Sequence, residues 1–236
     1  MKMSSSIARF VSARLSPEGT FGRHLTIGLL ILIITSWLFS TIAESVVAGD
    51  AITVVDVRLA HWLHAQATPG LTNTMLTITH LHSAIGIVAL SLVFGWYLIG
   101  RKEWYWLSTL ALAVAGGMLL NVAIKHLFQR IRPSFDDPLL TLTTYSFPSG
   151  HTTGSTLFYG MLAAYLVCRT PSLPSRILIV LSACAMVTLT GVSRMVLGVH
   201  YLSDVLAAVL FGTAWLALCL TAISSVRRHR ALRTPD

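Results

Sequence analysis

Six apolar segments, separated by short polar stretches, run through this chain. They cover residues 25–47, 76–99, 104–125, 150–168, 177–196 and 201–223. A helix needs about 20 mostly apolar residues to cross the hydrocarbon core of a bilayer. Each segment is of that order, so the sequence predicts an all-α fold. We expect an integral membrane bundle of six transmembrane helices, formed by residues 1–236 as a single domain.

The composition agrees with lipid as the main solvent. Hydrophobic residues make up 54% of the chain and charged residues only 11%, whereas a soluble domain carries about 25% charged residues. The net charge of +8 is compatible with nucleic-acid binding. The basic residues, however, lie in short clusters between apolar segments, as in the loops of membrane proteins. We therefore expect contact with the lipid bilayer and no nucleic-acid partner.

The distribution of Lys and Arg predicts the orientation of the bundle. Twelve of the seventeen basic residues fall on the side of the two termini, many of them in the basic tails at 1–24 and 224–236. Basic residues favour the cytoplasmic side. We expect a multi-pass protein of the plasma (inner) membrane, with cytoplasmic termini and its other face periplasmic or extracellular. Residues 25–47 are too long for a signal-peptide core and are interpreted as a retained anchor.

Residues 51–67 connect the first two apolar segments on the outer side. A polar side formed by Asp56, Arg58 and His61 lies opposite apolar side chains that recur at helical spacing: Ile52, Val55, Leu59, Trp62 and Leu63. This pattern predicts a short amphipathic helix that lies in the membrane interface.

Basic residues end the third apolar segment. Lys125 and Arg132 are seven residues apart and share a helical face if the helix continues. Pro133 disfavours helix at the residue before it. Two interpretations stay open at this point: an anion site, or a basic helix end whose side chains reach up to the lipid headgroups.

The fourth segment opens with Pro148, Ser149, Gly150 and His151. Pro and Ser are typical of helix starts, and the free N–H groups there attract anions. Gly150 would let a phosphate approach the backbone closely. The alternative is a plain helix start with an interfacial histidine.

His200 and Asp204 are four residues apart on what we expect to be one helix, so their side chains can meet. Ionisable groups inside a membrane are costly and usually functional. A carboxylate on one imidazole nitrogen leaves the other nitrogen free as a nucleophile. The alternative is a buried pair that holds two helices together. If the segments alternate in direction, Lys125, His151, Arg194 and His200 all meet at the outer face.

These residues form three motifs: Lys-x6-Arg-Pro, Pro-Ser-Gly-His and Ser-Arg-x5-His-x3-Asp. In this order and spacing they resemble the signature of the type 2 phosphatidic acid phosphatase superfamily, over about residues 75–225. The resemblance implies that His200 is the nucleophile, that Asp204 orients it, and that His151 is the general acid and base. It also implies the groups that hold the phosphate: Lys125, Arg132, Ser149, Gly150 and Arg194.

Two further residues are secondary candidates. Arg130 lies off the face of Lys125 and either contacts a second phosphate or headgroup, or is a plain interfacial charge. Asn121, one turn before Lys125, is a candidate for orienting it. The cysteines and carboxylates have no metal-binding spacing, so we expect no metal and no cofactor.

The resemblance implies a membrane lipid phosphate as substrate, held by its tail in the bilayer while its phosphate enters among the last four segments. Three motif cations and Arg130 favour a diphosphate, with undecaprenyl diphosphate as the leading candidate. Phosphatidylglycerol phosphate, phosphatidic acid and lipid A are alternatives. A six-span transporter or scaffold is the non-enzyme alternative, but it predicts polar residues near the midplane. Soluble acid phosphatases and vanadium haloperoxidases share the motifs and lack the apolar segments.

Overall fold

The computed structural model describes residues 23–233, and every regular element within them is helical. The elements are α2 (Arg23–Ala48), α3 (Ala51–Ala65), α4 (Pro69–Leu81), α5 (Ala84–Gly100), α6 (Trp104–Ala111), the π-helical η1 (Leu112–Gly116), α7 (Gly117–Phe128), α8 (Gly150–Arg169), α9 (Leu173–Val196) and α10 (Leu202–Arg233). The predicted all-α class is confirmed. Two basic tails were predicted, at 1–24 and 224–236. Residues 1–22 of the first and residues 234–236 of the second lie outside the described residues.

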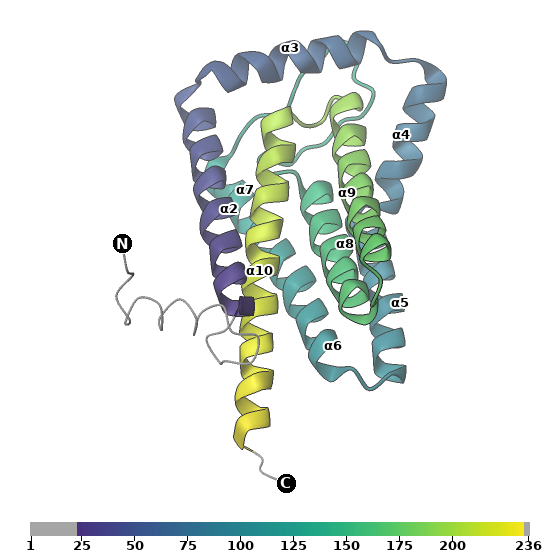
Figure 1. Ribbon diagram of the computed structural model, residues 1–236. Helices are drawn as coiled ribbons and strands as arrows, with labels where there is room; N and C mark the ends of the chain where they lie inside the picture. Colours follow the sequence, from purple (N-terminus) through teal and green to yellow (C-terminus); the bar gives the residue numbers. More distant parts are fainter. Residues whose placement is uncertain (1–22, 234–236) are drawn as a thin grey trace.

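The long helices form a bundle, and α3 lies across one end of it (Figure 1). α10 packs along α2 on one side and α8 on the other, and α8 in turn packs along α9. The irregular segment 129–149 runs between this end of the bundle and α3. α3 and this segment therefore cover the ends of α7, α8, α9 and α10.

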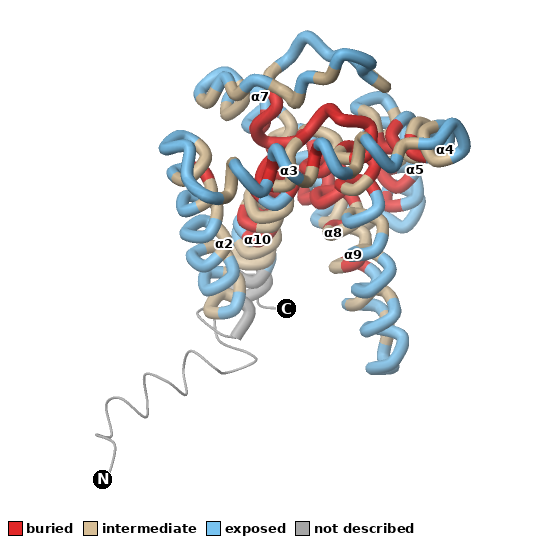
Figure 2. The backbone as a smooth tube through the Cα atoms, turned by 90° about the horizontal axis from the view of Figure 1, so that it is seen from above, coloured by how far each residue is buried: buried red, intermediate tan, exposed pale blue. Residues whose placement is uncertain are grey.

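The outer surface of the bundle is apolar. On α2, Leu30, Ile33 and Trp37 are 53%, 56% and 67% exposed. Figure 2 shows the contrast: buried residues gather beneath α3, where α7, α8 and α10 meet, whereas α2 and much of α9 are exposed. Side chains of this kind are stable at the surface only in contact with lipid. The protein is therefore a membrane-embedded, multi-pass protein.

Close helix packing holds the core together. Leu98, Leu157, Met161 and Tyr165 are almost fully buried between α5, α6 and α8. A Cβ added at Gly212 on α10 would lie only 2.9 Å from the Thr156 side chain on α8. Small residues allow membrane helices to approach closely, because packing rather than hydrophobic exclusion drives their association.

The prediction of six spans is met only in part. Within residues 23–233, four helices are long and apolar enough to cross a bilayer: Leu25–Ala48, Trp104–Phe128, Leu173–Val196 and Leu202–Arg227. The predicted span at 76–99 is instead a pair of helices, Pro69–Leu81 and Ala84–Gly100, bent by 50°. The bend follows from a new helix start at Ser83, whose side chain accepts the Gly86 N–H at 3.2 Å.

The remaining predicted span, 150–168, corresponds to α8, which is not among these apolar helices. Its N-terminal half is rich in Thr and Ser that are buried against the other helices, including Thr152, Thr153 and Ser155. Those hydroxyls lower its hydropathy but make hydrogen bonds inside the bundle, as between Ser155 and Thr190. A helix surrounded by protein does not need an apolar surface.

The predicted helix at 51–67 is present as α3, but its inward face differs from the expectation. Asp56, placed on the polar side by its spacing, is only 1% exposed, and Ala60, one turn further on, is also buried. Val55 and Trp62, placed on the apolar side, are 50% and 60% exposed. The reason is a set of polar partners for Asp56 beneath the helix, described below.

Candidate active site

His200 and Asp204 meet at the start of α10. His200 lies in the turn between α9 and α10, just before the helix begins, so the two residues do not share one helix as predicted. Their side chains still meet, with His200 Nδ1 3.3 Å from Asp204 Oδ2. The same carboxylate oxygen accepts the Tyr201 N–H at 2.9 Å. Both side chains are buried, so this geometry is held by protein on all sides.

The partners of His200 assign its tautomer. A carboxylate only accepts hydrogen bonds, so Nδ1 carries the proton and Nε2 has a free lone pair. Arg132 Nη1 donates to Nε2 at 3.0 Å. Burial, followed by the charge of Arg132, holds the pKa of His200 well below its ordinary value of 6.5. The imidazole is therefore neutral at pH 7, as a nitrogen nucleophile requires.

Arg194, near the end of α9, is a buried cation with few hydrogen-bond partners. Its side chain is almost inaccessible, and Nη1 donates to Thr79 Oγ1 on α4 at 2.6 Å. Its Nε and Nη2 have no hydrogen-bond partner. A buried, unpaired charge is unfavourable. These two nitrogens carry three N–H groups that can donate to an anion.

Lys125 and Arg132 reach the site by a route that the sequence did not indicate. α7 ends at Phe128, where Gln129 adopts a left-handed conformation with φ 47°, so the two residues do not share one helical face. Instead the segment 129–149 folds back over the bundle. Lys125 Nζ donates to Tyr145 O at 2.6 Å, and Arg132 Nη2 donates to the same oxygen at 3.0 Å.

The start of α8 faces a cavity beside these cations. Ser149 precedes the helix, and its N–H donates to the backbone oxygen of Asp204 at 3.1 Å, which ties α8 to α10. The cavity has a volume of about 540 Å³ and is lined by Lys125, Gly150 and His151 among others. A Cβ at Gly150 would lie 3.4 Å from Asn121 Oδ1 on α7, so α7 and α8 approach each other closely here. Gly150 and His151 place the start of α8 in the wall of the cavity, and N–H groups at a helix start attract anions. We call Lys125, Arg132, Arg194 and the start of α8 the cation pocket.

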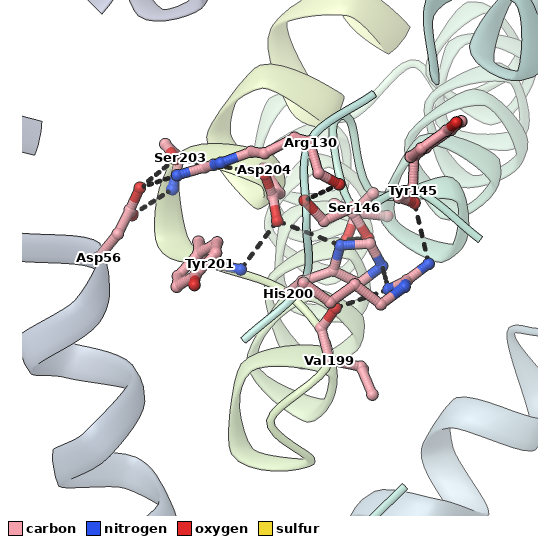
Figure 3. A network of polar contacts seen from close by, with 12 residues as sticks. Asp56, Arg130, Tyr145, Ser146, Val199, His200, Tyr201, Ser203 and Asp204 are labelled. Carbon is pink, nitrogen blue, oxygen red and sulfur yellow. Dashed lines mark hydrogen bonds and ion pairs between the residues drawn. The ribbon is translucent and has the colours of Figure 1, made fainter. Parts of the chain in front are cut away.

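Arg130 does not match either predicted role. Its Nη1 donates to Asp204 Oδ1 at 2.6 Å and its Nη2 to Asp56 Oδ2 at 2.8 Å. It also donates to Ser203 Oγ at 2.7 Å and stacks over the Tyr201 ring. Arg130 is thus neither a free cation for a second phosphate nor a plain interfacial charge. Figure 3 shows it lying between Asp56 on α3 and Asp204 on α10.

Asn121 also departs from the prediction. Its Nδ2 donates to Thr153 Oγ1 at 2.9 Å, which links α7 to α8. It therefore supports the start of α8, on which His151 lies, and makes no recorded hydrogen bond to Lys125.

Three residues near the site were not singled out from the sequence: Asp56, Thr79 and His82. Asp56 binds Arg130, Thr79 binds Arg194, and the buried His82 lines the cavity while bonded to Tyr159 Oη at 2.9 Å. All three come from residues 51–82. The side-chain partners named here are 74 or more positions away in the chain, so no local spacing pointed to them.

Within residues 23–233, no group of three or more His, Cys, Asp or Glu side chains is arranged to hold a metal ion. The positive charge next to His200 comes from side chains. Chemically, the arrangement combines a neutral imidazole, a second histidine and three cations, which suits transfer of a phosphoryl group.

Comparison with known proteins agrees with this chemistry. Residues 104–228 match the model of the PAP2 superfamily. The chain is 29% identical to phosphatidylglycerophosphatase B of Bacillus subtilis over 84% of this chain and 97% of that protein. It is 32% identical to decaprenylphosphoryl-5-phosphoribose phosphatase of Mycobacterium tuberculosis over 72% and 88% of the two chains.

The fold has a similar counterpart among solved structures. The crystal structure of a transmembrane PAP2-type phosphatidylglycerolphosphate phosphatase from Bacillus subtilis superposes with a TM-score of 0.73 and 28% identity. The match covers 80% of this chain and 94% of that one. It therefore extends beyond the matched segment 104–228 into the helices that precede it.

Proposed function

Since this chain belongs to the PAP2 superfamily and is a membrane-embedded phosphoric ester hydrolase, we propose that it removes phosphate from a lipid through a phosphohistidine on His200. The observation that carries this proposal is the pairing of a neutral, oriented imidazole with a buried cation, Arg194, that has two unpaired nitrogens. An anion that enters the site gains both a nucleophile and a counter-charge.

In the first step, Nε2 of His200 attacks phosphorus and the bond from phosphorus to the lipid oxygen breaks. The phosphate displaces Arg132 from Nε2 and keeps it as a hydrogen-bond donor. The bound phosphate anion beside His151 favours the protonated form of its imidazole, and this imidazolium gives its proton to the leaving lipid oxygen. Asp204 stabilises the imidazolium that forms, because its carboxylate already accepts from Nδ1.

In the second step, His151, now deprotonated, takes a proton from water. The resulting hydroxide attacks phosphorus, the bond from Nε2 to phosphorus breaks, and inorganic phosphate leaves. Ser149, Gly150 and the cations Lys125, Arg132 and Arg194 hold the phosphoryl oxygens in both steps. Positioning and electrostatic stabilisation supply most of the catalysis of phosphoryl transfer, so we expect no requirement for a metal ion or another cofactor.

An apolar groove next to the site supports a lipid as substrate. The groove has a volume of about 630 Å³ and lies between α5 and the α6–η1–α7 rod. It shares Ala84, Ile87 and Met118 with the cavity that contains His151. A lipid tail in this groove would place its phosphate at the cations. We therefore propose that the tail lies between the second and third predicted apolar segments, whereas the sequence analysis placed the entry of the phosphate among the last four.

The charges favour a monophosphate over a diphosphate. The preference for undecaprenyl diphosphate counted Arg130 as a possible fourth cation beside the three motif cations, and Arg130 is paired with two carboxylates. The three cations that remain suit one phosphate group. We therefore propose a glycerophospholipid phosphomonoester of the phosphatidylglycerol phosphate type, which is also the substrate named for the similar Bacillus subtilis enzyme. Undecaprenyl diphosphate, phosphatidic acid and lipid A serve as comparison substrates.

We further propose that residues 1–236 form one phosphatase domain with six passages through the plasma membrane, the bent pair α4–α5 and α8 each counting as one. The site then faces the periplasm or the exterior, and α3 lies in the outer interface. A protein whose three cysteines, Cys168, Cys184 and Cys219, are replaced by Ser provides the background for a labelling test. Ser134→Cys should react with an impermeant thiol reagent in intact cells and Lys102→Cys should not. The reverse pattern would invert the orientation.

The activity is tested with purified full-length protein on phosphatidylglycerol phosphate, undecaprenyl diphosphate and a water-soluble phosphomonoester. We expect the highest kcat/KM on phosphatidylglycerol phosphate, full activity in excess chelator, and inhibition by vanadate. Equal cleavage of the soluble ester would contradict a lipid substrate. Loss of activity in chelator with recovery in Mg²⁺ would contradict the role given to Lys125, Arg132 and Arg194.

A further inference from the structure

Asp56 is a buried carboxylate in an otherwise half-exposed helix. Its side chain is fully buried, whereas its neighbours Val55 and Val57 are 50% and 44% exposed. Burying a carboxylate is costly unless hydrogen bonds and an opposite charge compensate. Its partners should therefore explain why α3 directs an acid inward.

Those partners lie at the start of α10. Asp56 Oδ1 accepts the Ser203 N–H at 2.9 Å, and Oδ2 accepts from Ser203 Oγ and from Arg130 Nη2. Ser203 is in the first turn of α10, where N–H groups have no partner within the helix. A carboxylate at this point caps the helix and interacts favourably with its dipole. Asp56 thus fixes the start of the helix that carries Asp204.

Arg130 extends this connection to the nucleophile. It holds Oδ1 of Asp204, while Oδ2 is left for His200 Nδ1 and the Tyr201 N–H. Because each carboxylate oxygen has its own partners, the carboxylate cannot rotate away from His200 without losing hydrogen bonds. We call Asp56, Arg130, Ser203 and Asp204 the Arg130 network (Figure 3).

We propose that Asp56 and Arg130 are positioning residues for the reaction: they hold Asp204 in place and set the charge that faces the His200 imidazolium. This inference rests on the proposed phosphohistidine step. The two carboxylates and one guanidinium carry one net negative charge. When His200 is phosphorylated and becomes cationic, that charge balances it.

Stability alone does not account for the network. Buried ion pairs contribute little to stability compared with apolar residues of the same volume. If the network served only to attach α3 to the bundle, apolar contacts would be sufficient. α3 has Val and Trp side chains that could make such contacts, but they are exposed. The network instead connects α3 to His200 through a continuous series of charged side chains, Asp56, Arg130 and Asp204.

The test compares kinetics of full-length variants on phosphatidylglycerol phosphate. Asp56→Asn keeps the shape and removes the charge. We expect kcat to fall about 10-fold or more, as when outer partners of functional histidines are removed, with KM within about twofold because no substrate contact is lost. The matched control is Asp50→Asn, which removes a charge at the start of the same helix from a side chain that makes no capping bond. Its kcat should equal that of the wild type.

A double variant separates positioning from docking. Asp56→Asn with Arg130→Gln restores the one net negative charge. We expect its loss of kcat to be smaller than the product of the two single losses. Rates are divided by the folded fraction from thermal melting in the same detergent. A docking role predicts that the losses then disappear, which would overturn the proposal.

If Asp56→Asn does not fold, Arg130→Lys is used as the test variant. Lysine keeps the positive charge, but its ammonium group cannot bridge two carboxylates as the planar guanidinium does. A lower kcat at unchanged KM supports the proposal, and an unchanged kcat overturns it. An inactive wild type would contradict the proposed function itself. An active wild type with an unaffected Asp56→Asn variant contradicts the positioning role alone.

Discussion

The cation pocket and the Arg130 network lie at the same end of the bundle and differ in how they compensate positive charge. In the pocket, Lys125, Arg132 and Arg194 bind backbone oxygens, hydroxyls and an imidazole, all of them neutral. In the network, Arg130 binds two carboxylates. A phosphate can displace neutral acceptors, but it competes poorly with carboxylates that are already in place.

The difference teaches that motif position and charge do not decide which arginine binds substrate. Arg130 and Arg132 are two residues apart, and both were candidates for phosphate contact. One is committed to Asp56 and Asp204, whereas the other contacts His200 Nε2. The partner of each cation, rather than its place in the sequence, separates binding from positioning.

The largest expected effect is at His200, which lies between the two regions. His200→Ala should lower kcat roughly 10⁶-fold, as loss of a nucleophile does in other covalent enzymes. No phosphoenzyme should form when labelled substrate is mixed with the variant and quenched. Substantial turnover in this variant would show that His200 is not the nucleophile. The proposed roles of the cation pocket and the Arg130 network in its reaction would then be wrong.

Arg194→Met probes the cation pocket. This change keeps much of the volume and removes a buried cation whose Nε and Nη2 are unpaired. We expect kcat/KM to fall by about 10²–10³-fold, as when one donor to a developing oxyanion is lost. The melting temperature of the ligand-free protein should not fall, because an uncompensated charge has been removed.

Arg176→Met, an exposed arginine on the same helix, is the control and should retain kcat/KM. A lower melting temperature in Arg194→Met would mean that Arg194 is compensated after all, and the contrast with Arg130 would be lost.

Asp56→Ala probes the Arg130 network. It should lower the stability of the protein, whereas Arg194→Met should not. It leaves Arg130 with one carboxylate and Ser203 without a partner for its N–H. Breaking a buried ion pair costs about 3–5 kcal/mol. Unfolding in detergent should report a lower free energy of unfolding for Asp56→Ala than for Arg194→Met. Equal stabilities would show that the two regions do not differ as described.

The smallest expected effect concerns pH. The pKa of His200 is lowered in the folded protein, chiefly by burial. The unfolded chain therefore binds this proton first as the pH falls below about 6.5. Stability should decrease with falling pH in that range by up to about 1.4 kcal/mol per pH unit. Above about pH 6.5, the stability should not depend on the protonation of His200.

Thermal melting between pH 7.5 and 5 tests this expectation, with His200→Gln as the reference. The variant should lose less stability on acidification than the wild type. An identical decrease in both proteins would mean that His200 does not contribute to the pH dependence.

The sequence was sufficient for the helical class, and its motifs selected residues that lie close together in the structure. Apolar length predicts helices in lipid, because backbone groups must be satisfied within each segment. The motif spacing selected Lys125, Arg132, His151, Arg194 and His200, and the structure places these residues around one end of the bundle. Such patterns are local, so they can be read along the chain.

The hydropathy pattern was less reliable for α8 and for the α4–α5 pair. α8 carries buried hydroxyls that are satisfied by other helices, so its polarity says little about its position in the bundle. The bend at Ser83 depends on one capping side chain within an apolar segment. In both cases a few hydrogen bonds outweigh the average character of the segment.

The roles of Arg130, Asp56 and Thr79 depended on the tertiary structure. Arg130 and Asp56 are 74 residues apart, Arg194 and Thr79 are 115 apart, and Ser203 and Asp56 are 147 apart. No periodicity relates residues at such separations. The fold brings them together beneath α3, because a buried charge requires a partner and the nearest one comes from another helix.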